Sequence, residues 1–127
     1  MTEISLIRLD DPEKVRVDDS GRSVAYFCRT APMKVDTNLI EELKGAALSL
    51  DGSNVRLCLH ESPESLFHEM INLEHRGKYY RPHKHEHKGE SYHIIEGAMA
   101  AFIFNQDGKV IDANVLKPDG NFLYRVD

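Results

Sequence analysis

Four of the seven histidines in this chain lie between residues 83 and 93, together with two glutamates. They are His83, His85, His87 and His93, accompanied by Glu86 and Glu90. Imidazole nitrogens and carboxylate oxygens are common protein ligands of zinc, iron, manganese and nickel. A cluster of this composition therefore indicates a metal site, provided that the spacing brings the side chains together.

The spacing selects three of these residues. Side chains alternate between the two faces of a strand, so His83 and His85 point the same way, roughly 6–7 Å apart. If the chain turns over residues 86–89, Glu90 enters a neighbouring antiparallel strand beside them. Two imidazoles and one carboxylate then converge, an arrangement that leaves open coordination positions on a metal.

The remaining residues of the cluster have other expected positions. We expect His87 and Glu86 in the turn, and His93 on the face opposite Glu90 because its parity differs. The alternative for the whole stretch is a solvated polar hairpin without a metal.

The spacing also resembles the first conserved motif of the cupin superfamily. Five residues separate Gly77 from His83, one separates His83 from His85, four separate His85 from Glu90, and six separate Glu90 from Gly97. The resemblance implies that the two histidines and the glutamate bind the metal. It also implies a double-stranded β-helix, which is a jelly-roll barrel.

A wider stretch is similar to the small WbuC-type cupin metalloproteins. The segments that carry this likeness are Arg56–His60, His68–Met70, Tyr80–His85 with Lys88 and Glu90, and Phe104–Gly108. Members of that group are often encoded among genes for surface polysaccharide or O-antigen synthesis. The resemblance implies a metal and a sugar-related setting, but no defined substrate.

The chain departs from the cupin pattern at the second motif. Pro118-Asp119-Gly120 forms a suitable turn, but Leu123 stands where that motif has histidine. Two explanations stay open. Either the chain stops before the second motif and lacks the last barrel strands, or His60 or His68 completes the site.

The patterns of apolar and polar residues predict a mainly β fold independently of the resemblance. Residues 1–35 read as extended pieces, including strands at Ile4–Leu9 and Ser23–Cys28. Apolar residues recur at helical spacing over 36–51, with Asp36, Thr37 or Asn38 as N-cap and an Asn38–Glu41 capping box. Residues 54–127 alternate as barrel strands. The expected strands are Val55–His60, Phe67–Leu73, Tyr79–His85, Glu90–Ile95 paired with Ala98–Phe104 across Glu96-Gly97, Val110–Leu116 and Phe122–Val126.

Several polar residues are candidates for lining the pocket. Arg56, Cys58 and His60 share one strand face, which points either to solvent or into a polar cavity. The other candidates are His68 and Tyr80. Arg56 is suited to binding a carboxylate or a phosphate, with an ordinary surface arginine as the alternative.

Composition narrows the classes of protein. A chain of 127 residues fits a single domain, here 1–127. The net charge of -5 disfavours nucleic-acid and anionic-membrane partners. Acidic residues come too early to leave the apolar core of a signal peptide, and no uninterrupted apolar run approaches membrane-spanning length, so we expect a cytoplasmic protein. Cys28 and Cys58 are then reduced thiols, although a disulfide between them stays open.

The combined expectation is a metal-binding cupin that acts on a small polar metabolite, linked to sugar or polysaccharide metabolism. Its metal would be divalent iron, manganese, zinc or nickel. Three classes stay open: a metal-dependent sugar isomerase or epimerase, an iron-dependent dioxygenase, and a non-catalytic sugar- or metabolite-binding module. A fourth reading is adventitious metal binding. We expect a homodimer formed by strand exchange, with a strand from residues 1–30.

Overall fold

A computed structural model describes residues 5–127 of the chain. These residues are mainly β, with a single short helix, as the sequence patterns predict. The chain divides into two compact units, unit 1 up to Lys78 and unit 2 from Tyr79 to Asp127. Over residues 5–127 the strands form four separate sheets and no closed barrel.

Unit 1 is built on a four-stranded sheet in the order β2-β3-β5-β6. Its strands are β2 (Val15–Asp18), β3 (Val24–Cys28), β5 (Val55–Cys58) and β6 (Met70–Leu73). The β3 and β5 strands are parallel, and the chain between them contains α1, while the other two pairs are antiparallel. A small parallel pair joins β1 (Ser5–Leu6) to β4 (Met33–Lys34), and Ile4 of the predicted first strand lies outside the described residues.

The helix α1 (Thr37–Ser49) begins at Asp36, one of the three predicted caps. Asp36 Oδ1 accepts a hydrogen bond from Leu39 N at 3.0 Å, which satisfies a backbone donor of the first turn. The predicted Asn38–Glu41 capping box is wrong, because Asn38 already lies inside the helix and Asp36 fills the cap position.

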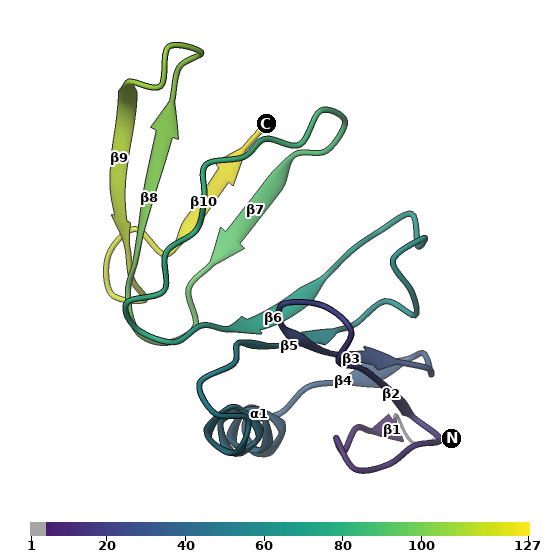
Figure 1. Ribbon diagram of the computed structural model, residues 1–127. Helices are drawn as coiled ribbons and strands as arrows, with labels where there is room; N and C mark the ends of the chain where they lie inside the picture. The colour runs from purple at the N-terminus through teal and green to yellow at the C-terminus, as the bar shows by residue number, and fades with distance from the viewer. Residues whose placement is uncertain (1–4) are drawn as a thin grey trace. The chain divides into compact units, whose positions relative to one another are not determined.

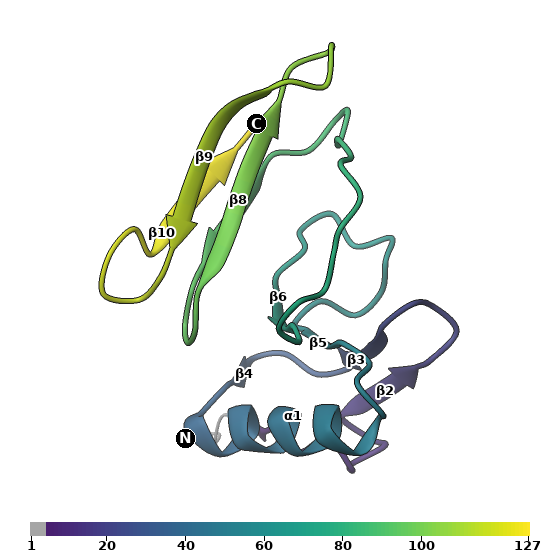
Figure 2. The ribbon, with the colours of Figure 1, turned by 60° about the vertical axis from the view of Figure 1, so that its left-hand side comes forward.

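Unit 1 holds its main core between α1 and one face of the sheet (Figures 1 and 2). Helix residues Leu39, Leu43 and Ala47 are buried at helical spacing against Val55 and Leu57 of β5. A smaller apolar cluster lies on the strands at Ala25, Phe27 and Cys58, with Met70 packed against it. Both cysteines are buried free thiols, and burial raises the pKa of Cys28 to about 11.

Unit 2 consists of two antiparallel strand pairs (Figure 1). The strands are β7 (Glu90–His93), β8 (Met99–Phe104), β9 (Val110–Leu116) and β10 (Leu123–Val126). The β8 and β9 strands form a hairpin, and β7 pairs with β10. The predicted pairing of β7 with β8 across Glu96-Gly97 is wrong, because Ile94 N donates to Phe122 O at 2.9 Å and extends the β7–β10 pair.

The β8–β9 hairpin leaves one apolar face exposed. Phe102 is 54% exposed and pairs across the hairpin with Ala113. The face continues through Ala100, Phe104, Val110 and Val115, all of them exposed. Leu116 is fully buried and follows the opposite parity to Val115. The hairpin therefore has one face packed and one face open.

Candidate metal site

The three predicted ligands come from one loop and one strand of unit 2. His83 and His85 lie in the segment Tyr79–Gly89, which forms no strand, so the predicted strand Tyr79–His85 is absent from the structure. Glu90 is the first residue of β7, where its backbone pairs with Val126 of β10. The carboxylate is therefore held by a strand, and the imidazoles are carried by a loop.

His85 and Glu90 are in direct contact. His85 Nε2 lies 3.0 Å from Glu90 Oε1, and their side chains are 43% and 38% exposed. The His83 ring stands perpendicular to that of His85 with centroids 5.2 Å apart. His83 Nδ1 donates to the backbone oxygen of Arg81 at 3.0 Å, so its Nε2 is the nitrogen left to bind a ligand.

Tyr92 holds the second oxygen of the same carboxylate. Its hydroxyl donates to Glu90 Oε2, and both side chains lie on the same face of β7 because they are two residues apart. Burial raises the pKa of Tyr92 to about 12, with further contributions from the hydrogen bond and the charge of Glu90. The hydroxyl thus stays protonated near neutral pH. Sequence reasoning missed Tyr92, although its parity with Glu90 was a signal that could have found it.

The His85–Glu90 pair fits the donor set of a divalent metal. Two ligand atoms about 2.1 Å from one metal lie roughly 3.0–3.4 Å apart at angles between 90° and 109°. The observed 3.0 Å separation falls in this range. Over the residues that the structure describes, no three His, Cys, Asp or Glu side chains form a group able to hold a metal. His83 therefore lies beside the pair without completing a three-ligand site.

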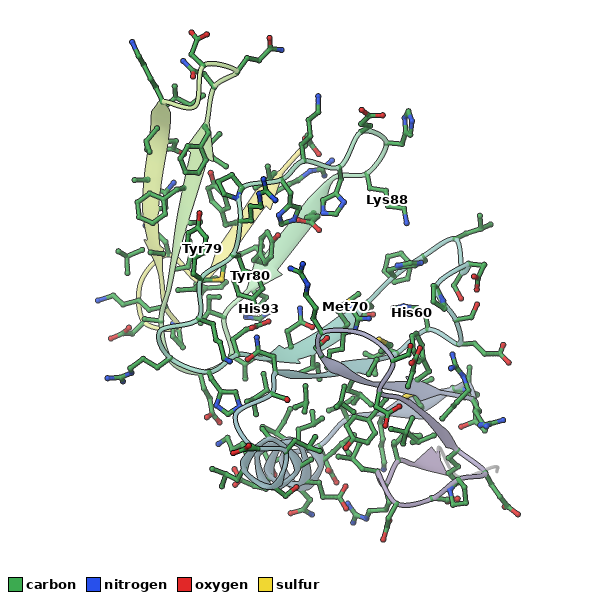
Figure 3. All side chains as sticks on the ribbon, viewed as in Figure 1. His60, Met70, Tyr79, Tyr80, Lys88 and His93 are labelled. Atoms are coloured by element: carbon green, nitrogen blue, oxygen red, sulfur yellow. The ribbon has the colours of Figure 1, made fainter. Side chains whose placement is uncertain are left out.

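The other residues of the cluster lie away from this pair. Glu86 and His87 occupy an exposed bend. His93 ends β7 with a parity opposite to Glu90, and its ring centroid lies 5.7 Å from that of Phe122 (Figure 3).

The predicted pocket residues are divided between the two units. Tyr80 belongs to unit 2 and is 57% exposed. Arg56, Cys58, His60 and His68 belong to unit 1. His60 and His68 stack with ring centroids 4.2 Å apart and an interplanar angle of 9°. Phe27 meets the His60 ring edge-on at 5.8 Å.

An open pocket of about 320 Å³ lies elsewhere in unit 1, against α1. Its lining residues are Leu9, Asp10, Tyr26, Glu42 and Ala46. None of the predicted site residues contributes to it. Metal coordination depends on donor atoms rather than on open volume, so the polar contacts at Glu90 mark the candidate metal site.

Comparison with known proteins identifies the family to which the chain belongs. A family model described as a domain of unknown function (DUF6016) matches residues 35–116, which is more than half of the chain and includes every predicted site residue. No curated protein and no solved structure matches the chain. Among the residues that the structure describes, no helix has the length and apolar character needed to cross a membrane.

Proposed function

The chain belongs to the DUF6016 family, and we propose that it is a metal-binding protein of the cupin type that acts on a small polar metabolite. The observation that carries the proposal is the series of contacts His85–Glu90–Tyr92 in unit 2, in which Glu90 meets the imidazole through one oxygen and accepts the tyrosine hydrogen bond through the other. A carboxylate with one oxygen on an imidazole nitrogen and the other on a hydroxyl is arranged like a metal ligand with its supporting partner.

The chain's own residues have distinct roles in this proposal. His85 and Glu90 bind a divalent iron, manganese, zinc or nickel ion, and His83 is their neighbour with Nε2 available. Tyr92 orients Glu90 and keeps its second oxygen satisfied. A bound metal would supply Lewis acidity toward a carbonyl or hydroxyl group. Because His85 and Glu90 are more than a third exposed, a small ligand can reach them.

The strand pairing of unit 2 supports a jelly-roll relationship. The fourth strand of the unit, β10, returns to lie beside the first, β7, and the β8–β9 hairpin lies between them in sequence. Return of a fourth strand to the first is a property that unit 2 shares with Greek keys, from which jelly rolls are built, although β7 does not pair with β8 as it would in a single Greek-key sheet. The positive φ angles of Gly77 (79°) and Gly97 (78°) also suit the two glycine positions of the cupin motif.

The proposed substrate class follows from the likeness to WbuC-type proteins. We place the metabolite among sugars and sugar derivatives used in surface-polysaccharide synthesis. Isomerisation or epimerisation is the reaction class that Lewis-acid chemistry at such a site would serve.

Metal analysis of the full chain, purified without a His-tag, tests the proposal. The double variant His83→Ala/His85→Ala should lose stoichiometric metal. The matched control His87→Ala/His93→Ala removes the same number of histidines from the same stretch and should retain it. Metal content unchanged by His83→Ala/His85→Ala would overturn the proposal, and equal loss of metal from both double variants would indicate adventitious binding.

A turnover assay separates an enzyme from a binding module. Metal-loaded protein is incubated with a panel of sugar phosphates and nucleotide sugars, and products are followed by mass spectrometry. Product formation that disappears in His83→Ala/His85→Ala supports the enzyme. Tight retention of one panel member without product would instead establish the non-catalytic sugar-binding function.

A further inference from the structure

We propose a second binding site in unit 1, where Arg56, His60 and His68 bind a small oxyanion such as a phosphate or carboxylate group. This site lies entirely within unit 1 and goes beyond the metal chemistry proposed for unit 2. The oxyanion site can therefore be tested independently of the metal site.

The strand register places these residues on one face of the sheet. Cys58 pairs with Met70 across β5 and β6, and Leu59 N donates to Glu69 O at 2.8 Å, which continues the pairing toward His60 and His68. Residues two apart on a strand share a face, so Arg56 lies on the same face as Cys58 and His60. Figure 3 shows His60 and Met70 on the side of the sheet away from α1.

Among the residues that the structure describes, two buried nitrogens on this face have no hydrogen-bond partner. Arg56 Nε and His68 Nε2 make no hydrogen bond to any residue that the structure describes. A guanidinium group only donates hydrogen bonds, so the missing partner of Arg56 must be an acceptor. Buried polar groups in native proteins are nearly always satisfied, and an unpaired one indicates a water, ion or ligand.

The charge of the face favours an anion. The Arg16 guanidinium carbon lies 4.4 Å from the centroid of the Phe27 ring. Burial raises the pKa of the Cys58 thiol, while the nearby positive charges of Arg56 and Arg16 act to lower it. Both guanidinium charges therefore lie near the centre of the face.

The Asp18 carboxylate, which lies beside Ala25 on this face, is hydrogen-bonded to Ser20. Asp18 Oδ1 accepts hydrogen bonds from Ser20 Oγ at 2.6 Å and Ser20 N at 3.0 Å. No ion pair joins Asp18 to Arg56 among the described residues. The hydrogen bonds from Ser20 lower the pKa of Asp18 most, and the charges of Arg16 and Arg56 lower it further. Arg56 Nε has no acceptor among the described residues, so its N–H is available to a ligand.

The two histidines lie on the same face, two residues along the strands from Cys58 and Met70, and their rings are held in place. His60 is only 9% exposed, and its Nδ1 lies 3.2 Å from both the backbone nitrogen and the backbone oxygen of Glu69. His68 stacks on this anchored ring, so its Nε2 is held in place before a ligand arrives. A guanidinium fork and a positioned imidazole together suit a planar or tetrahedral oxyanion.

Titration of the full chain with inorganic phosphate, and separately with succinate, tests the site. The His60 and His68 ring resonances are followed by NMR at constant ionic strength. We expect saturable shifts of both rings with millimolar anion. The tighter of the two probes identifies the ligand as a phosphate or a carboxylate.

Arg56→Gln should weaken binding by about tenfold or more, because a charge-assisted bond is lost. Arg56→Lys keeps the positive charge but loses the paired N–H donors of the guanidinium group. Its anion affinity should lie between those of Arg56→Gln and the parent chain. Lys44→Gln is the matched control, since it removes one positive charge from α1 on the opposite side of the sheet, and it should bind within about twofold of the parent chain. Thermal unfolding of each variant checks that the fold is retained.

Three results would overturn the site. The first is the absence of saturable ring shifts with either anion. The second is equal weakening by Arg56→Gln and Lys44→Gln, which would indicate a general charge effect. The third is equal binding by Arg56→Gln and the parent chain. Since the readout involves no metal, these results are independent of the metal content measured for unit 2.

Discussion

Glu90 Oε1 lies 3.0 Å from His85 Nε2, so the first residue of a strand is joined to the loop that precedes it. The backbone of Glu90 is fixed by pairing with Val126, whereas His85 has no strand to fix it. The carboxylate is consequently the positioned member of the pair. Its position in turn depends on Tyr92, which binds the other oxygen.

Removal of the Tyr92 hydroxyl should therefore weaken metal binding without removing a ligand. We expect Tyr92→Phe to lower the metal affinity by about 10–100-fold, the usual cost of losing a supporting hydrogen bond. Competition with a metal-sensitive chelating dye measures the change. Tyr124→Phe is the control, because Tyr124 donates to Asp112 at 3.0 Å instead. Equal affinities for the two variants would remove Tyr92 from the site.

The same hydroxyl should titrate abnormally. Its pKa is raised to about 12 in the folded chain from an ordinary value of 10.0. The folded state therefore binds this proton more tightly than the unfolded state. Its contribution to stability is complete below pH 10 and is lost as the pH rises toward 12. The difference in tyrosinate absorbance between the parent chain and Tyr92→Phe reports this titration.

Substitution of Glu90 tests whether its charge and hydrogen bond contribute to the raised pKa of Tyr92. Glu90→Gln removes the negative charge and leaves the burial of the tyrosine. The pKa of Tyr92 should then fall below 12 and remain above 10. A midpoint unchanged from that of the parent chain would show that Glu90 does not contribute to the shift.

A methyl group at Gly89 should loosen the β7–β10 pair. A Cβ atom there would lie 2.5 Å from Asp127 Oδ1 and 3.2 Å from Val126 O. The Asp127 side chain can turn away, but the backbone oxygen must shift, so we expect Gly89→Ala to cost about 1–3 kcal/mol. Faster amide exchange in β7 and β10 would show the loss locally.

Gly45 offers the opposite case for comparison with Gly89. Apart from its chain neighbours and the backbone of its own helix, no atom of the described residues lies within 4 Å of a Cβ added at this position in α1. We expect Gly45→Ala to stabilise the helix by about 0.5–1 kcal/mol, because alanine loses less backbone entropy on folding. If both alanine variants had the same effect on stability, the close approach at Gly89 would not be the reason.

The helix cap can be tested by a pair of substitutions. Asp36→Ala should lower the stability of unit 1 by about 1 kcal/mol, because Leu39 N loses its acceptor. Asn38→Ala should have little effect, since Asn38 is inside the helix. Denaturant unfolding followed by helical circular dichroism measures both. A larger loss from Asn38→Ala would restore the capping-box interpretation.

Local patterns in the sequence predicted the helix and most of the longer strands, although the predicted strand Tyr79–His85 is absent. The strand Val110–Leu116 has the predicted bounds, and the helical spacing of Leu39, Leu43 and Ala47 correctly located α1 and its buried face. These predictions succeeded because alternation and helical periodicity are determined by residues close in the chain. The two-residue strand β4 and the short strand β2 were not predicted, because a strand of two to four residues is too short to show a clear alternation of apolar and polar side chains.

Strand partners were harder to predict than strands. A glycine after β7 suggested a hairpin with β8, but β7 pairs with β10 instead. The choice between these partners depends on backbone hydrogen bonds such as Ile94 N to Phe122 O, which join residues far apart in sequence. Contacts within the candidate site were likewise harder to predict than the residues that form it. Motif spacing selected His83, His85 and Glu90, whereas the contact of Tyr92 with Glu90 depends on side-chain geometry.

The pairing of β7 with β10 around the β8–β9 hairpin also sets an order of assembly. Hairpins close in microseconds, whereas β7 and β10 are joined only across the whole hairpin and its connections. Closing β8 on β9 first shortens the effective loop that β7 and β10 must span. We therefore expect the β8–β9 hairpin to form first and β7, the strand that carries Glu90, to pair with β10 afterwards. Destabilising mutations in β8 or β9, which carry none of the proposed ligands, would then slow the formation of the metal site.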